Sequence, residues 1–170
     1  MSTGRVQGPL DGVPGVTRVV LPIEVNAIES VNMYVIDDGE KVTVVDCGVW
    51  KPERPDGGLA TVEAGLQGAG YALADVSRVI ITHAHIDHYG LAGEVVRRSG
   101  GELWMHRRTD LDLTKYEDPD EAVDRRMLML ADHGLYGPEL TETSEGLRDW
   151  LPVMPSTVSR ARSSASDTAS

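Results

Sequence analysis

The chain of 170 residues contains no phenylalanine and only one cysteine, Cys47. A single cysteine excludes an intramolecular disulfide, and its place inside Val45-Asp46-Cys47-Gly48 favours a small buried side chain. Without phenylalanine, the core must be built from valine, leucine and isoleucine with three tryptophans. The sequence therefore predicts a domain that is held together by aliphatic packing rather than by cross-links.

Positive charge is also scarce, since 16 basic residues stand against 27 acidic ones and the formal net charge is −11. Binding to a nucleic-acid backbone depends on clustered Lys and Arg, so we expect no nucleic acid among the partners. No apolar run is long enough to span a bilayer, and residues 1–9 lack the apolar core of a signal peptide. We therefore expect a cytoplasmic protein without membrane contact, whose partner is a small-molecule substrate.

Length and composition favour one folded domain. A hydrophobic content of 41% in 170 residues is typical of a soluble domain with a substantial core. Residues 1–15 are expected to form a flexible segment. Residues 156–170 are rich in Ser and Ala and contain no aromatic residue, so we expect a disordered tail. Residues 16–155 remain as the folded domain.

Strand signals dominate the first part of this domain. β-Branched residues predict strands over 16–23 and 31–36, and Asp38 with Gly39 predicts a hairpin turn into the next strand. We expect these strands to form an antiparallel edge of a sheet. A further apolar run at 79–82 predicts a strand that leads directly into a histidine-rich segment.

Helix signals follow in three places. Apolar residues at helical spacing predict a helix that ends near Gly70 and a shorter one that ends at Gly100. Residues 118–121 supply a capping Asp, a Pro at the first helical position and a Glu at the third, which predicts a helix that runs to about His133. From Gly137 onward no regular pattern is visible.

The segment 82–90 concentrates metal-binding side chains. It contains three of the five histidines and one carboxylate, at positions His83, His85, Asp87 and His88. In an extended segment side chains alternate, so the last histidine faces away from the others unless the chain turns. Imidazole nitrogen with carboxylate oxygen suits Zn²⁺, or a related ion such as Fe or Mn, whereas Ca²⁺ and Mg²⁺ prefer oxygen alone.

We predict one or two metal ions at this segment. The first two histidines hold one ion, and Asp87 with His88 holds a second. A polar loop that happens to be rich in histidine is the alternative, but a position at the end of a strand is where such sites form.

The pattern His-x-His-x-Asp-His at 83–88 resembles the signature of the metallo-β-lactamase-fold hydrolases. Residues 33–48, a strand pair that ends in Asp46-x-Gly48, resemble the same family, and the likeness covers about residues 16–110. The resemblance implies an α/β (α+β) fold, a partial αββα sandwich made mostly of the N-terminal sheet with its helices. It also implies that Asp46 lies below the metal pocket and orients the ligands. Turn formation with Gly48 is the rival explanation.

The resemblance further implies hydrolysis. Zinc lowers the pKa of a bound water to about 7 and polarises a carbonyl oxygen. A metal-held hydroxide then attacks an ester, thioester, lactone or amide, with Asp87 as the catalytic residue that ligates the second ion and orients the water. Tyr89 either donates to the developing oxyanion or packs in the core.

Family members complete their site with a further histidine, a bridging aspartate and a last histidine from a second half of the fold, and none of those segments is visible here. Two ions that share four side chains have about two ligands each, fewer than the three of an ordinary catalytic zinc. We interpret His133 as a helix-terminal residue and His106 as a partly buried residue near the rim of the site.

The alternative function is therefore a truncated, non-catalytic fragment that keeps the metal loop without completing a dinuclear site. A premature stop or a shifted reading frame would account for both the tail at 156–170 and the missing half. An incomplete fold also makes a homo-oligomer the expected assembly.

Overall fold

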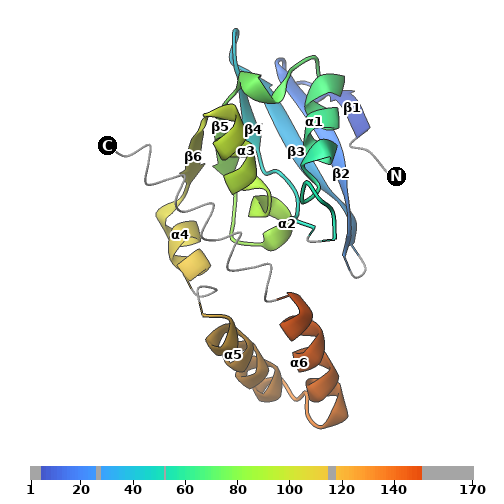
Figure 1. Cartoon of the computed structure of the whole chain (residues 1–170), viewed down its shortest axis with the longest axis vertical. Coiled ribbons are helices and arrows are strands. Elements are labelled where there is room, and N and C mark those ends of the chain that lie inside the picture. The colour runs from blue at the N-terminus through green and yellow to red at the C-terminus, as the bar shows by residue number, and fades with distance from the viewer. Residues whose placement is uncertain (1–4, 26–27, 52, 115–117, 151–170) are drawn as a thin grey trace.

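The computed structural model describes residues 5–25, 28–51, 53–114 and 118–150, and six strands among them form one mixed sheet (Figure 1). The strands follow one another across the sheet in chain order, from β1 at one edge to β6 at the other. The first four strands pair antiparallel, whereas β4, β5 and β6 run parallel. The bounds are β1 Arg5–Pro9, β2 Val16–Val25, β3 Ile28–Asp37, β4 Val42–Val45, β5 Val76–Ile81 and β6 Glu102–Met105.

Turns and crossovers in the sequence explain this order. Gly39 closes the tight turn between β3 and β4 with a φ of 97°, and its N–H donates to Asp37 Oδ1 at 2.8 Å, which confirms the predicted hairpin. Parallel strands need a crossover connection, and helices α1 (Leu59–Gly68) and α3 (Ala92–Ser99) supply the crossovers into β5 and β6. Both predicted helices lie on the same face of the sheet (Figure 1).

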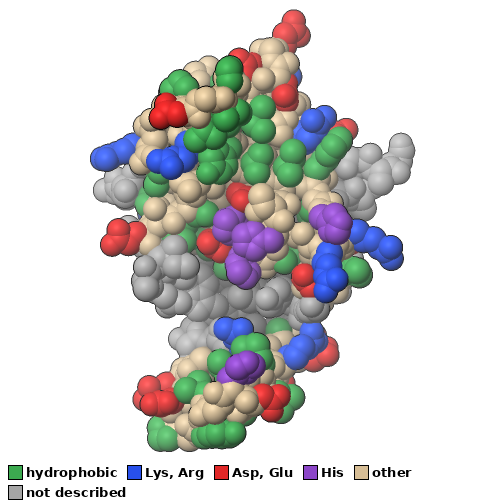
Figure 2. Space-filling view, turned by 180° about the vertical axis from the view of Figure 1, so that it is seen from behind, with side chains coloured by type: hydrophobic (Ala, Val, Ile, Leu, Met, Phe, Trp, Pro, Cys, Tyr) green, Lys and Arg blue, Asp and Glu red, His purple; other side chains and the backbone are tan. Residues whose placement is uncertain are grey.

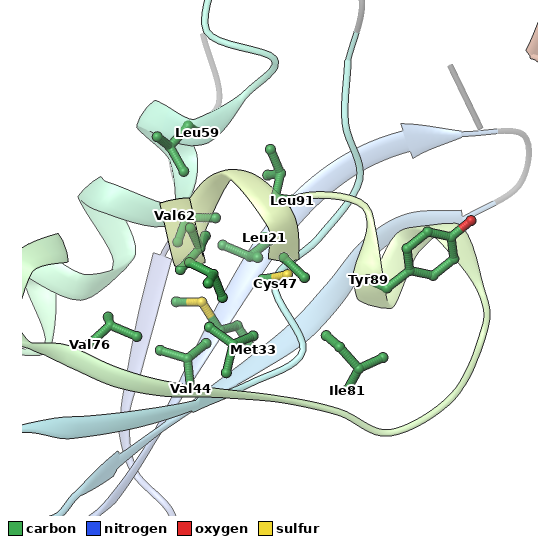
Figure 3. Close-up of a cluster of buried hydrophobic side chains, with 14 of the residues drawn as sticks. Leu21, Met33, Val44, Cys47, Leu59, Val62, Val76, Ile81, Tyr89 and Leu91 are labelled. Atoms are coloured by element: carbon green, nitrogen blue, oxygen red, sulfur yellow. The ribbon is translucent and has the colours of Figure 1, made fainter. Parts of the chain in front are cut away.

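The hydrophobic core lies between the sheet and these helices (Figure 3). Alternate residues of each strand point to this face, as the period of two in a strand requires. Val19 and Leu21 of β2 and Met33 of β3 are at most 2% exposed. Helix α1 approaches β2 closely, because a Cβ on Gly65 would lie 2.6 Å from Val19 Cγ1. The core is aliphatic, as the composition predicts.

No described helix covers the opposite face of the sheet, where hydrophobic side chains gather (Figure 2). Val20, Val45 and Ile80 are half-buried there, and Trp104 is 50% exposed. The guanidinium carbon of Arg78 lies 4.1 Å from the centroid of the Trp104 ring. A sheet with one buried face and one half-exposed apolar face is one half of a layered sandwich, so the predicted partial αββα fold is confirmed.

The structure differs from the flexible segment that we expected at residues 1–15. Arg5–Pro9 form strand β1, which pairs with β2 and has a register shift between Val6 and Gly8. Gly8 and Pro9 weaken the local strand signal, and pairing with β2 decides the conformation instead. Val6 packs into the notch at Gly68, where an added Cβ would lie 2.5 Å from the valine.

Three further helices follow the sheet: α4 Arg107–Leu113, α5 Pro119–Asp132 and α6 Pro138–Trp150. Helix α5 confirms the predicted start, since the Glu121 N–H donates to Asp118 Oδ1 at 3.1 Å. Helix α6 was not predicted, and it packs against α5.

Among the described residues, no helix combines the length and the apolar character needed to cross a membrane. The tail predicted at 156–170 lies outside the described residues.

The buried carboxylate of Glu94 on α3 predicts a pH-dependent contribution to stability. It is 8% exposed and accepts hydrogen bonds from Arg97 at 2.6 and 2.9 Å and from Arg98 at 2.7 Å, and these interactions lower its pKa to about 2. Because the folded pKa lies below the ordinary value of 4.5, the stabilisation is complete above that pH and is lost as the pH falls toward 2.

Glu94→Gln is therefore expected to lower the free energy of unfolding by about 1–2 kcal/mol near neutral pH, a value reduced because both guanidinium groups are solvent-exposed. The difference from the wild type should shrink as the pH falls below 4.5. Urea unfolding of both proteins along a pH series measures this. A difference that does not change with pH would contradict the role of the ionised carboxylate.

Candidate metal centre

The histidine-rich segment follows the carboxyl end of β5, within the parallel part of the sheet. A short helix that the sequence did not predict, α2 (Ile86–Tyr89), begins directly after His85. Asp87 lies in the first turn of α2 and His88 follows it. The turn brings the His88 ring to 4.1 Å from the His83 ring, measured between centroids. An extended chain would have pointed this last histidine away.

Hydrogen bonds between backbone groups hold α2 against the chain that leaves β4. The Cys47 N–H donates to the His88 carbonyl at 2.9 Å, and the Leu91 N–H donates to the Gly48 carbonyl at 3.3 Å. Gly90 lies at this contact, where an added Cβ would be 2.6–2.8 Å from three backbone atoms. The position of the metal loop therefore depends on a close backbone approach that only glycine permits.

The four predicted ligands lie together, in two pairs. His83 Nε2 is 3.0 Å from His85 Nδ1, and His88 Nε2 is 3.5 Å from Asp87 Oδ2. The side chains of the second pair are about a fifth exposed, at 22% and 20%. Figure 2 shows a cluster of histidines at the surface, below the apolar face of the sheet. The division of these ligands between two ions stays a prediction.

Asp46 organises this cluster from beneath, as the resemblance implied. It is 5% exposed, and its φ of 56° makes it the one non-glycine residue of the described chain with a left-handed backbone. Its carboxylate accepts from the Thr82 N–H at 2.9 Å, from Thr82 Oγ1 at 2.8 Å and from His88 Nδ1 at 2.7 Å. Since a carboxylate can only accept, Nδ1 carries the hydrogen and Nε2 of His88 keeps a lone pair for a ligand.

The rival explanation of Asp46 as a plain turn residue is insufficient, because both carboxylate oxygens bond to Thr82 and His88 rather than to its own turn. The left-handed backbone stores strain that the surrounding hydrogen bonds must maintain. Residues in such conformations cluster at functional sites. The sequence signal for this role was only the pattern Asp-x-Gly at the end of a strand.

The fold and the loop agree with the comparisons to known proteins. The sequence-family model of the metallo-beta-lactamase superfamily matches residues 28–156, which is most of the chain. The chain belongs to the metallo-beta-lactamase superfamily. This confirms the resemblance that the histidine motif and the strand pair indicated.

Solved structures of this superfamily share only part of their length with the chain. A metallo-beta-lactamase family protein from Thermus thermophilus has 26% identity and a TM-score of 0.57, over 78% of this chain and 42% of that one. A metallo-beta-lactamase from Cronobacter sakazakii has 18% identity and a TM-score of 0.48, over 62% of this chain and 37% of that one. A subclass B3 metallo-beta-lactamase from a soil metagenome has 19% identity and a TM-score of 0.49, over 66% of this chain and 39% of that one. No curated protein matches the chain.

This metallo-beta-lactamase superfamily member thus spans less than half the length of the solved structures that it matches. The described residues form one sheet with its helices. The loop 83–88 and Asp46, which holds it from beneath, both belong to this part of the fold. The superfamily typically binds metal ions.

The residue types of the loop suit a metal ion, because imidazole nitrogen and carboxylate oxygen are zinc ligands. His83 Nε2 and His85 Nδ1 share a hydrogen bond at 3.0 Å, so one ring must turn or lose that hydrogen before both nitrogens can face one ion. Burial lowers the pKa of His83, and His88 and His85 lower it further, which favours the neutral form that binds metal.

The two pairs do not merge into one complete site. Among the described residues, no three or more His, Cys, Asp or Glu side chains are grouped so that they could hold one ion together. Two donors for each ion are fewer than the three protein ligands of an ordinary catalytic zinc. Each ion would need a further ligand from outside these pairs, and the ligand roles of the four side chains stay a prediction.

Cys47 and Tyr89, next to the loop, belong to the core rather than to the site (Figure 3). Cys47 is fully buried, and burial raises the pKa of its thiol, which disfavours the thiolate that a metal requires. Tyr89 is 1% exposed and belongs to the core cluster, which confirms that its side chain packs.

The two remaining histidines lie apart from the four. His133 ends α5, and its Nδ1 lies 2.7 Å from the Met129 carbonyl, which confirms the prediction of a helix-terminal residue. His106 is exposed rather than partly buried, because it caps α4 and its Nδ1 accepts from the Arg108 N–H at 3.2 Å. It follows β6, one strand away from the metal loop.

Proposed function

We propose that this protein is a metal-dependent hydrolase that acts on an ester, thioester, lactone or amide, with zinc as the metal. The observation that carries the proposal is the arrangement of four nitrogen and oxygen donors in two pairs at 3.0 and 3.5 Å on a loop of the superfamily signature. A bound zinc ion lowers the pKa of a coordinated water to about 7 and polarises a carbonyl group.

The residues of the loop have distinct roles in this proposal. His83 and His85 hold the first ion, and Asp87 and His88 hold the second. Asp87 also orients the attacking water, because its carboxylate is partly exposed at 20% and can accept a hydrogen bond. Asp46 keeps the His88 ring in the tautomer that leaves Nε2 free.

The chain covers 42% of its solved relative from Thermus thermophilus, so a ligand from outside the two pairs is part of the proposal. The sources are another part of a longer protein, a second subunit or solvent. A non-catalytic metal-binding chain is the competing function, and superfamily membership favours the hydrolase over it.

The test is turnover of a thioester and a lactone by the zinc-loaded protein. His85→Ala removes one donor of the first pair, and the matched control His133→Ala removes a histidine at the far end of α5. We expect hydrolysis that falls at least about 100-fold in the first variant, since loss of an oriented catalytic group costs 10²-fold or more. The control should keep full activity.

Two results separate the competing functions. Metal that binds with a stoichiometry of one or two ions, without turnover, supports the non-catalytic chain. Turnover that survives His85→Ala unchanged contradicts a role for this pair in hydrolysis.

A further inference from the structure

The hydroxyl group of Thr82, the residue between β5 and His83, makes two hydrogen bonds at the candidate metal centre. Thr82 Oγ1 lies 2.8 Å from Asp46 Oδ2 and 3.0 Å from His83 Nδ1. The Thr82 N–H donates to the other oxygen of the same carboxylate at 2.9 Å. The backbone and the side chain of one residue therefore hold the hydroxyl group between Asp46 and the first histidine of the loop.

A hydroxyl group has one hydrogen, and this decides the direction of the two bonds. The ionised carboxylate of Asp46 can only accept, so the Thr82 hydroxyl donates its hydrogen to Asp46. Toward His83 the oxygen then offers only a lone pair, so the hydrogen of that bond belongs to His83 Nδ1. A neutral imidazole with its hydrogen on Nδ1 keeps the lone pair on Nε2, and this lone pair can bind a metal ion.

The neighbouring histidines agree with this direction. His83 Nε2 lies 3.0 Å from His85 Nδ1, and a lone pair on Nε2 lets it accept from His85. His88 Nδ1 donates to Asp46 directly, at 2.7 Å. Thr82 therefore links His83 to the same carboxylate that His88 contacts without an intermediate.

We propose that Thr82 is a positioning residue for metal binding, whose hydroxyl group holds the His83 ring in the Nδ1–H tautomer, so that Nε2 binds the ion. The inference rests on the metal-binding role of His83 in the proposed function, and it adds a residue outside the four donors. Metal-binding histidines depend on a partner at their second ring nitrogen, and loss of that partner typically costs about 10–100-fold in metal affinity. Thr82 acts through His83 and is not itself a ligand.

Two substitutions separate the hydroxyl group from the shape of the side chain. Thr82→Val keeps the branched shape and the backbone N–H and removes the hydroxyl, whereas Thr82→Ser retains it. Each oxygen of Asp46 still has a donor in Thr82→Val, the N–H of residue 82 or His88 Nδ1, so the carboxylate is not left without partners. Thr43→Val is the matched control, because it removes another hydroxyl that donates to a carboxylate, that of Asp38 at 2.5 Å.

The tautomer is measured first, in the zinc-free protein, from the nitrogen chemical shifts of the histidine rings at mildly alkaline pH. The signals that His83→Gln removes identify His83. We expect the Nδ1–H form in the wild type, in Thr82→Ser and in Thr43→Val. In Thr82→Val the Nδ1 hydrogen loses its acceptor, so we expect the Nε2–H form to increase. This readout depends neither on bound metal nor on turnover.

Zinc affinity is measured next, by competition with a chromophoric chelator. We expect Thr82→Val to bind zinc about tenfold more weakly than the wild type, the lower end of the range for loss of such a partner. Thr82→Ser and Thr43→Val should bind zinc as the wild type does.

Three results overturn the proposal. One is an Nε2–H tautomer of His83 in the zinc-free wild type. Another is a Thr82→Val protein in which either the tautomer or the zinc affinity is unchanged. The third is an equal loss in Thr82→Ser and Thr82→Val, which would assign the effect to something other than the hydroxyl group. Absence of zinc binding in the wild type would instead contradict the proposed function, and the tautomers would still decide whether Thr82 holds the His83 ring.

Discussion

Replacing Asp46 by alanine is expected to destabilise the protein by about 3 kcal/mol and to weaken metal binding by about 10–100-fold. The carboxylate accepts three hydrogen bonds, and two of its donors, the Thr82 N–H and His88 Nδ1, would be left without this partner in a part-buried site. The His88 ring would also lose the contact that fixes its orientation. Urea unfolding and titration of the purified apoprotein with Zn²⁺ measure the two effects.

The conservative variant Asp46→Asn separates the fold from the metal. Asparagine tolerates the left-handed backbone at φ 56° and can still accept one hydrogen bond. We expect it to keep most of the stability and to lose metal affinity, because the amide no longer holds His88 as a carboxylate does. Equal metal affinity in the wild type and both variants would show that Asp46 does not orient the ligands.

The second large effect is expected from Gly90→Ala. Gly90 has a φ of −55°, which alanine adopts freely, so the cost comes from contact alone. The new Cβ would lie 2.6 Å from the Ile86 carbonyl oxygen, 2.7 Å from the Trp50 nitrogen and 2.8 Å from Val49 Cα. Backbone atoms on three sides leave no side chain to move away. We expect a loss of about 2–3 kcal/mol in stability.

The same substitution should lower zinc affinity, because α2 must shift and carries Asp87 and His88 with it. Gly39→Ala is the matched control, at a φ of 97° with no atom within 4 Å. It costs about 1–2 kcal/mol through the left-handed backbone and leaves the metal loop in place. Zinc titration of both variants tests this. A Gly90→Ala protein with wild-type zinc affinity would contradict the account of the loop support.

The sequence alone predicted those elements whose signal lies within a few neighbouring residues. The hairpin at Asp38–Gly39, the cap at Asp118 and the cysteine in the core were each visible within a few residues of sequence. The cluster of donors at 83–88 was visible for the same reason. These features depend on turn, cap and ligand chemistry, which is local.

Features that depend on contacts between distant segments were not visible. The helical turn α2 bends the loop so that His88 returns to His83, and this bend is fixed by hydrogen bonds to the chain after β4. Strand β1 forms by pairing with β2 despite Gly8 and Pro9. Helix α6 is rich in polar residues and packs against α5. Long-range packing overrides weak local propensity in each case.

Quantification of bound metal tests the central claim most directly. The wild-type protein and a variant with alanine at all four donor positions are purified in Zn²⁺, freed of loose ions and analysed for zinc per chain; the four positions are His83, His85, Asp87 and His88. We predict one or two ions in the wild type and essentially none in the variant, with the aliphatic core still folded. Equal zinc content in both proteins would contradict the account.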